Sequence, residues 1–136
     1  MTYEKDFYAW TFEQAQKLRA GEPIDTENVA EEIESLGKSI EQELYNRLAV
    51  LMAHLLKCEF QADRQTRSWD LTIKEQRRRI AKLLAKNPSV RPKVAQVVID
   101  AYSTAVFLAA HETGIIEQDF PERCPYAVEE VLTDLT

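Results

Sequence analysis

A chain of 136 residues fits one folded domain, because two domains would each be too small to bury a sound core. Three glycines and five prolines are too few for the frequent turns of a β-rich fold, so the composition favours helices. The net charge is −6. Two cysteines are too few for a disulfide framework, and the polar N-terminus argues against a signal peptide. No apolar run approaches the roughly 18 to 20 residues that span a bilayer. We therefore expect a single cytoplasmic domain over residues 1–136, with no membrane partner.

Positive charge is concentrated in the middle of the chain. Residues 64–93 have ten basic and two acidic side chains, whereas residues 1–63 and residues 94–136 each have a net charge of −7. A basic segment of this kind could bind nucleic acid, but the overall acidity weakens contacts with phosphates. We favour a basic helix that packs between acidic ones, and we expect no nucleic-acid partner.

The first helix is predicted to begin after Asp6, whose carboxylate can cap the first turn, and to end at Gly21 and Pro23. One side of this helix is apolar and consists of Phe7, Trp10, Ala15 and Leu18. We expect Tyr8 and Trp10 to pack in the core or to dock the helix, rather than to form a binding surface.

A long second helix is predicted to begin at Asp25 or Thr26. Its apolar residues follow one another in steps of three or four: Val29, Ile33, Leu36, Ile40, Leu44, Leu48, Leu51 and Leu55. Gly37 stands inside this helix at a cost of about 1 kcal/mol relative to alanine, so we expect a kink or a short break there. Glu27, Glu31, Glu32 and Glu34 lie in the first turns, where carboxylates complement the helix dipole. Glu31, Glu32 and Glu34 diverge around the helix, which disfavours a metal site.

The third helix is predicted to follow a polar connection over residues 61–68. Asp70, or Thr72 with Glu75 at capping-box spacing, would begin it, and Lys86 would lie near its end. Its inward residues are expected to be Ile73, Ile80, Leu83 and Leu84, and its outward residues Arg77, Arg78 and Lys82.

A fourth helix is predicted to have Pro92 in its first turn and to end at Gly114. Its apolar stripe consists of Val94, Val98, Ala101, Ala105 and Leu108. A short last helix would begin at Pro125 and end near Asp134. The predicted fold is therefore all-α, an up-down bundle of four main helices plus a short C-terminal helix.

Several common chemistries lack their motifs in this chain. Three widely separated glycines cannot form a phosphate-binding loop, and neither cysteine belongs to a Cys-x-x-Cys pair. No Glu stands three residues before His54 or His111, so the ligand pairs of di-iron bundles are absent. We accordingly assign no catalytic residue, no metal and no cofactor.

One end of the predicted bundle collects polar residues that could form a site. His54 and Cys58 are four residues apart on the second helix, and Glu112 falls on the apolar face of the fourth. The second and fourth helices run parallel in an up-down bundle, so their C-terminal ends meet the start of the third helix. The candidate binding residues at this end are His54, Arg64, Arg67, Trp69, His111 and Glu112.

Three interpretations of this bundle end compete. The favoured one is structural, with His54 hydrogen-bonded in the core and Trp69 covering the end. The second is a pocket in which Arg64 and Arg67 bind a small anion or a peptide. The third is a transition-metal site at His54 and Cys58, for which two further ligands are unaccounted for.

Four ordered motifs resemble one known family over nearly the whole chain. They are Asp6-Phe7-Tyr8-Ala9-Trp10, the run from Ala30 to Gly37, His54-Leu55-Leu56-Lys57, and Arg67-Ser68-Trp69 with Glu75-Gln76-Arg77-Arg78. The family is domain of unknown function 29, found mainly in cyanobacteria. The resemblance implies an all-α fold and a cytoplasmic bacterial protein, and it implies no activity. Members of the family tend to have Trp at the position of Cys58, which argues against a metal ligand there.

The predicted function is that of a non-enzymatic interaction module. The apolar stripe of the second helix exceeds what a short bundle needs, so its surplus could bind a protein partner or a second copy of the chain. The alternative is a small-molecule or metal-binding enzyme that acts at the bundle end near Trp69. In that alternative His54 would be the acid–base group and Arg67 would hold an anion.

Overall fold

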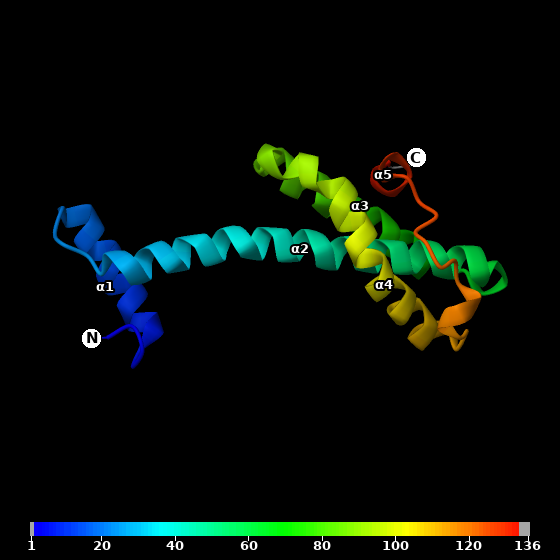
Figure 1. Cartoon of the computed structure of the whole chain (residues 1–136), viewed down its shortest axis with the longest axis horizontal. Coiled ribbons are helices and arrows are strands. Elements are labelled where there is room, and N and C mark those ends of the chain that lie inside the picture. The colour runs from blue at the N-terminus through cyan, green and yellow to red at the C-terminus, as the bar shows by residue number, and fades with distance from the viewer. Residues whose placement is uncertain (1, 134–136) are drawn as a thin grey trace. The chain divides into compact units, whose positions relative to one another are not determined.

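The computed structural model describes residues 2–133, which form helices and no strand. The helices are α1 (Phe7–Ala20), α2 (Thr26–Phe60), α3 (Arg67–Lys86), α4 (Val94–Thr113) and the short α5 (Val128–Leu132), with 3₁₀ segments at Ala62–Arg64, Pro88–Lys93 and Glu117–Asp119 (Figure 1). The predicted all-α fold with four main helices and a short C-terminal helix is confirmed.

The chain divides into two compact units, Met1–Ser39 and Ile40–Thr136, which are described separately. We call their described parts the N-terminal unit (2–39) and the C-terminal unit (40–133). The expectation of one domain over residues 1–136 stays a prediction.

The N-terminal unit is a hairpin of α1 and the start of α2. Trp10 is only 3% exposed, and its indole Nε1 donates to the Asp25 carboxylate at 3.1 Å. Gln14 is 6% exposed and accepts a hydrogen bond from the backbone N–H of Asp25 at 2.7 Å. The Tyr3 hydroxyl donates to the Glu32 carboxylate, which raises the pKa of Tyr3 to about 12. These side chains tie α1 to the first turns of α2.

The ends of α1 are as predicted. The Asp6 side chain accepts from the backbone N–H of Ala9, and Gly21 adopts a left-handed conformation with φ of 71°. A left-handed residue after a helix costs glycine little, because glycine has no Cβ.

The hydrophobic core lies in the C-terminal unit. There α3 runs antiparallel to the C-terminal part of α2, and α4 runs antiparallel to α3 (Figure 1). The side chains that are completely covered in this core come mainly from α2 and α4: Leu44, Leu48, Leu51, Leu56, Ala101, Ala105 and Ala109. The small residues of α4 let the helices approach closely.

The expected break at Gly37 is wrong, because α2 is a single uninterrupted helix from Thr26 to Phe60. The neighbouring positions hold good helix formers such as Lys38 and Glu41, which outweigh the cost of about 1 kcal/mol of one glycine. A Cβ added to Gly37 would meet no atom within 4 Å. No described residue of the chain therefore requires a glycine at this position.

The start of α3 also differs from the prediction. The helix begins at Arg67, and the Thr66 side chain caps it by accepting from the backbone N–H of Trp69 at 3.3 Å. Thr72, a predicted cap, lies inside the helix and donates to the carbonyl of Ser68 at 3.0 Å. Asp70, the other predicted cap, also lies inside α3, so the helix begins earlier than either candidate and Thr66 forms the cap.

Arg77 points inward and not outward as predicted. Its side chain is buried, with 8% of the residue exposed, and its guanidinium donates to two backbone carbonyls of α5. A buried guanidinium is tolerated only where its donors are satisfied, and the α5 carbonyls supply acceptors that no local signal in α3 predicts.

Two boundaries near the C-terminus need correction. Pro92 lies in the 3₁₀ segment Pro88–Lys93 that precedes α4, rather than in the first turn of α4. The last helix begins at Val128 and not at Pro125, and its predicted end near Asp134 lies outside the described residues. Gly114 ends α4 in a left-handed conformation, as predicted.

The segment Pro88–Thr113 contains an 18-residue stretch with a mean hydropathy of 1.3 and is long and apolar enough to cross a membrane by length and composition, although no such run was expected from the sequence. The core helix of a soluble protein passes the same test, and Val94, Val98 and Ala101 are buried in the core. The segment is therefore weak support for a membrane span.

Candidate functional site

Lys57 lies at the centre of the predicted bundle end, although the sequence did not single it out as a site residue. It is 5% exposed, its ammonium pairs with the Glu112 carboxylate, and its Nζ atom lies 4.7 Å from the centroid of the Trp69 ring. Glu112 and Trp69 were both predicted to meet here. The residue that joins α2, α3 and α4 at this point is a buried lysine.

The arrangement compensates most of the cost of burying an ammonium. The carboxylate of Glu112 neutralises the charge, and the face of the Trp69 indole attracts the cation. Lys57 stands almost alone as a charge in the apolar run 48–58 of α2, which is the signal that could have identified it. The Lys57 cluster thus joins side chains of α2, α3 and α4 through one ion pair and one cation–π contact.

His54 is half-buried and bonds to its own helix. Its Nδ1 atom lies 2.9 Å from the carbonyl oxygen of Val50. Burial lowers the pKa of His54 from its usual 6.5; the contact with Val50 and the charge of Glu112 oppose this, while Lys57 adds to it. The contact with Val50 is of the kind that the structural interpretation of His54 expects, and the lowered pKa leaves the ring neutral at pH 7.

The lowered pKa gives a pH-dependent stability. Above about pH 6.5 His54 is neutral in both the folded and the unfolded chain, so its contribution to the free energy of unfolding is fully present. As the pH falls below 6.5, the unfolded chain binds the proton first, and this contribution is lost. We expect His54→Gln to be less destabilised than the wild type by acidification from about pH 7 to pH 5 in urea titrations.

His111→Gln is the matched control, because His111 is exposed on α4 and only stacks on Phe107, with ring centroids 6.4 Å apart. It should keep the pH response of the wild type. Equal pH responses of His54→Gln and the wild type would contradict the assignment.

Arg64, Arg67 and Cys58 form no hydrogen bond or ion pair with Lys57. Arg64 lies in the 3₁₀ segment after α2, Arg67 is the first residue of α3, and both are exposed. Cys58 is a free, part-buried thiol, and burial raises its pKa. Within residues 2–133 no group of three or more His, Cys, Asp or Glu side chains is placed to hold a metal ion.

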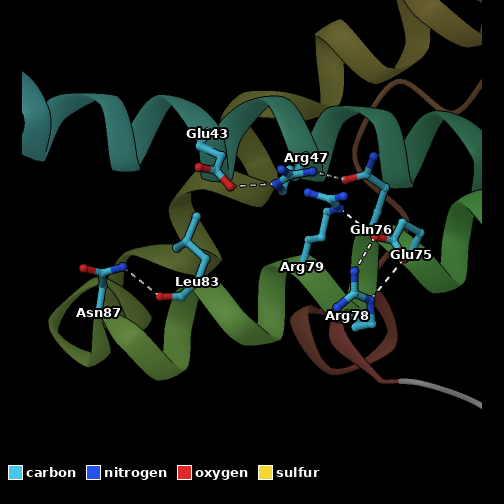
Figure 2. A network of polar contacts seen from close by, with 8 residues as sticks. All are labelled: Glu43, Arg47, Glu75, Gln76, Arg78, Arg79, Leu83 and Asn87. Atoms are coloured by element: carbon cyan, nitrogen blue, oxygen red, sulfur yellow. Dashed lines mark hydrogen bonds and ion pairs between the residues drawn. The ribbon is translucent and has the colours of Figure 1, made fainter.

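The basic face of α3 pairs partly within its own helix (Figure 2). Arg78 and Arg79 both bind the Glu75 carboxylate, at 2.7 and 2.6 Å, and these two guanidinium groups lower the pKa of Glu75 to about 2. Arg47 of α2 bridges Glu43 and Gln76. The expected pairing of the basic helix with acidic neighbours is thus replaced, for Arg78 and Arg79, by pairing inside α3.

The pockets formed by residues 2–133 include two in the C-terminal unit and one in the N-terminal unit. The C-terminal unit has one of about 570 Å³ between α4 and residues 117–122 and one of about 360 Å³ between α3 and α5. The N-terminal unit has one of about 460 Å³ beside Trp10 and Asp25. None of the six predicted site residues lines any of these three pockets.

The N-terminal unit has more exposed large apolar side chains than the longer C-terminal unit. Six of the eleven large hydrophobic residues that are exposed among residues 2–133 belong to it, with 48% to 74% of each exposed. We call this set the hairpin surface; it consists of Phe7, Tyr8, Phe12, Leu18, Ile33 and Leu36. Tyr8 thus has no core role, contrary to expectation, whereas Trp10 does.

Periodicity predicted apolar sides on both helices of the hairpin, but it could not show that these sides stay uncovered. Helical spacing reports which residues share a face and says nothing about what packs on it.

Comparison with known proteins identifies the family of the chain but no individual related protein. The family model described as Domain of unknown function DUF29 matches residues 2–135, nearly the whole chain, in agreement with the resemblance of the four motifs. No curated protein and no solved structure matches the chain.

Proposed function

We propose that this chain, which belongs to the family Domain of unknown function DUF29, is a non-enzymatic interaction module that binds another protein through the hairpin surface. The observation that carries the proposal is the exposure of six large apolar side chains on one small helical hairpin. Surfaces of this kind on soluble proteins usually mark interaction sites.

The hairpin has very little core of its own. Trp10 and Gln14 are its only buried residues among positions 2–39. Units below about 40 residues usually need a disulfide, a metal or a partner chain to be stable. Both cysteines lie in the other unit and are free thiols, so no disulfide stabilises the hairpin, and a partner chain would stabilise it by covering its exposed apolar side chains.

The uncovered area is large enough to matter. Six side chains of roughly 150 to 200 Å² each, about three-fifths exposed, leave about 600 Å² of apolar surface open to water. This area is spread over both helices of one small unit, and exposed apolar surface on a folded protein often marks an interaction site. We further place the module in the cytoplasm of a bacterial cell, where free thiols such as Cys58 and Cys124 persist.

The bundle-end alternative has less support. Lys57 is already paired with Glu112 and with the Trp69 ring, and the His54 ring is held by Val50. No observation favours a substrate or a metal at this end of the molecule.

Site-specific photo-crosslinking in cells tests the proposal. A benzophenone amino acid at Leu36, on the hairpin surface, should give a discrete covalent adduct with another polypeptide. The same probe at Glu31 should give none, because Glu31 is also exposed on α2 but lies roughly 140° from Leu36 around the helix. No adduct at Leu36, or equal adducts at both positions, would overturn the proposal.

A further inference from the structure

We infer that the protein on the hairpin surface is a second copy of this chain, and that two hairpins pair into a four-helix bundle. The inference rests on the proposed function and names its partner. A hairpin with exposed apolar residues on both of its helices supplies two of the four helices of such a bundle, and a two-fold axis would cover these residues of both hairpins at once.

The apolar residues of α2 in the hairpin have the spacing of a helix-packing seam. Val29, Ile33 and Leu36 follow at steps of four and three, with Ile33 63% and Leu36 67% exposed. Alternating steps of four and three place side chains where they insert between those of a second, similar helix. Branched Ile beside Leu is a composition that such seams favour.

The other helix contributes a broad apolar face. Phe7 and Leu18 lie within roughly 20° of each other around α1, and Tyr8 and Phe12 lie on the adjoining side, where their rings touch with centroids 5.0 Å apart. All four are exposed. Both helices of the hairpin therefore present apolar side chains for a partner to cover.

Charge does not oppose self-pairing through this surface, although the unit as a whole is acidic. Glu31 lies roughly 160° from Ile33 around α2, and Glu27 lies roughly 120° from it, so these carboxylates point away from the seam. The carboxylate of Glu32, nearer the seam, is already bound by the Tyr3 hydroxyl. Glu34 is exposed about 100° from Ile33 on the flank opposite Glu32, so the acids of α2 lie beside the seam or away from it and not within it.

Gly37 gives an independent indication. It lies roughly 40° from Ile33, beside the seam, and nothing within 4 Å of it fills the space of a side chain. A glycine inside a helix lowers stability and is used where another backbone comes close. The chain itself makes no such approach at Gly37, whereas a second helix packed on Ile33 and Leu36 would.

The area agrees with a dimer. Two hairpin surfaces of about 600 Å² each would bury about 1,200 Å², which is the lower limit of specific, stable interfaces. Part-buried residues such as Val29 and Ala15 would add to this area on contact.

Sedimentation equilibrium of the full chain over a dilution series tests the inference. The expected result is a reversible dimer with twice the 15.7 kDa of one chain. Leu36→Gln and Gly37→Gln should each raise the dissociation constant roughly tenfold or more, since the first removes apolar contact and the second fills the space beside the seam. Ser35→Gln, an exposed position roughly 160° from Ile33, should leave the constant unchanged.

The two proposals fail differently. A monomer at every concentration, together with an adduct to a different protein at position 36, would overturn the second copy and leave the interaction module standing. A dimer that neither Leu36→Gln nor Gly37→Gln weakens would place the contact elsewhere and also overturn the inference. Positions 36 and 37 are exposed, so we expect both variants to keep their helix content. Unchanged circular dichroism spectra would show that loss of helix does not cause the dissociation.

Discussion

Replacing Arg77 by methionine is expected to lower the free energy of unfolding by about 2 to 4 kcal/mol and to release α5 from α3. The buried guanidinium donates from Nε to the carbonyl of Val131 at 2.9 Å and from Nη2 to that of Glu130 at 2.8 Å. These carbonyls lie in the last turn of α5, where helix geometry supplies no further N–H donor. Methionine occupies a similar volume but donates nothing, so it would leave the buried carbonyl of Val131 and the part-buried carbonyl of Glu130 without this donor.

Urea unfolding measures the global effect, and hydrogen exchange of residues 128–132 measures the release of α5. The matched control is Arg78→Met, one position along α3, where the guanidinium is exposed and binds Glu75. Exposed ion pairs contribute little to stability, so this variant should unfold close to the wild type. Equal behaviour of the two variants would show that Arg77 does not anchor α5.

The inward position of Arg77 shows what sequence periodicity can and cannot predict. Arg77 stands four residues after Ile73 and three before Ile80, so helical spacing places it on the apolar face. Its residue type led to the opposite expectation. The acceptors that make its burial possible belong to α5, more than fifty residues later, and local sequence contains no trace of them.

Lys57 repeats this lesson at the bundle end. Spacing predicted that Glu112 and Trp69 would approach each other, because the ends of antiparallel helices meet. The buried lysine between them was missed, since lysine is rarely buried without a partner and the partner comes from another helix.

Helix boundaries were predictable where the signal is local. Asp6, Gly21 and Gly114 act at the positions expected of them, because a cap depends on a few neighbouring backbone groups. The break at Gly37 was not found, because one glycine costs less than a long helix gains from its other residues. The exposure of the hairpin surface could not be predicted, since spacing identifies a face but not its cover.

Replacing Trp10 by alanine is expected to destabilise the N-terminal unit by about 3 to 5 kcal/mol and to undock α1 from α2. Trp10 is the one large apolar side chain buried among the described residues of this unit, and its rings touch those of Tyr3 and Phe7. The change would remove these contacts together with the hydrogen bond from Nε1 to Asp25. Hydrogen exchange of residues 7–20 should become fast, while that of residues 44–56 should stay slow.

Two further variants separate the causes. Trp10→Phe keeps a ring in the hairpin but loses the hydrogen bond to Asp25 and part of the indole packing, so it should cost about 1 to 2 kcal/mol, less than Trp10→Ala. Tyr8→Ala changes a residue that is 74% exposed and should leave the exchange of α1 slow in the monomer. If Trp10→Ala left the exchange of α1 unchanged, the hairpin would not depend on this side chain. If Trp10→Ala undocks α1, this variant should also give a weaker photo-crosslink from position 36. The apolar residues of α1 would then no longer be held near those of α2.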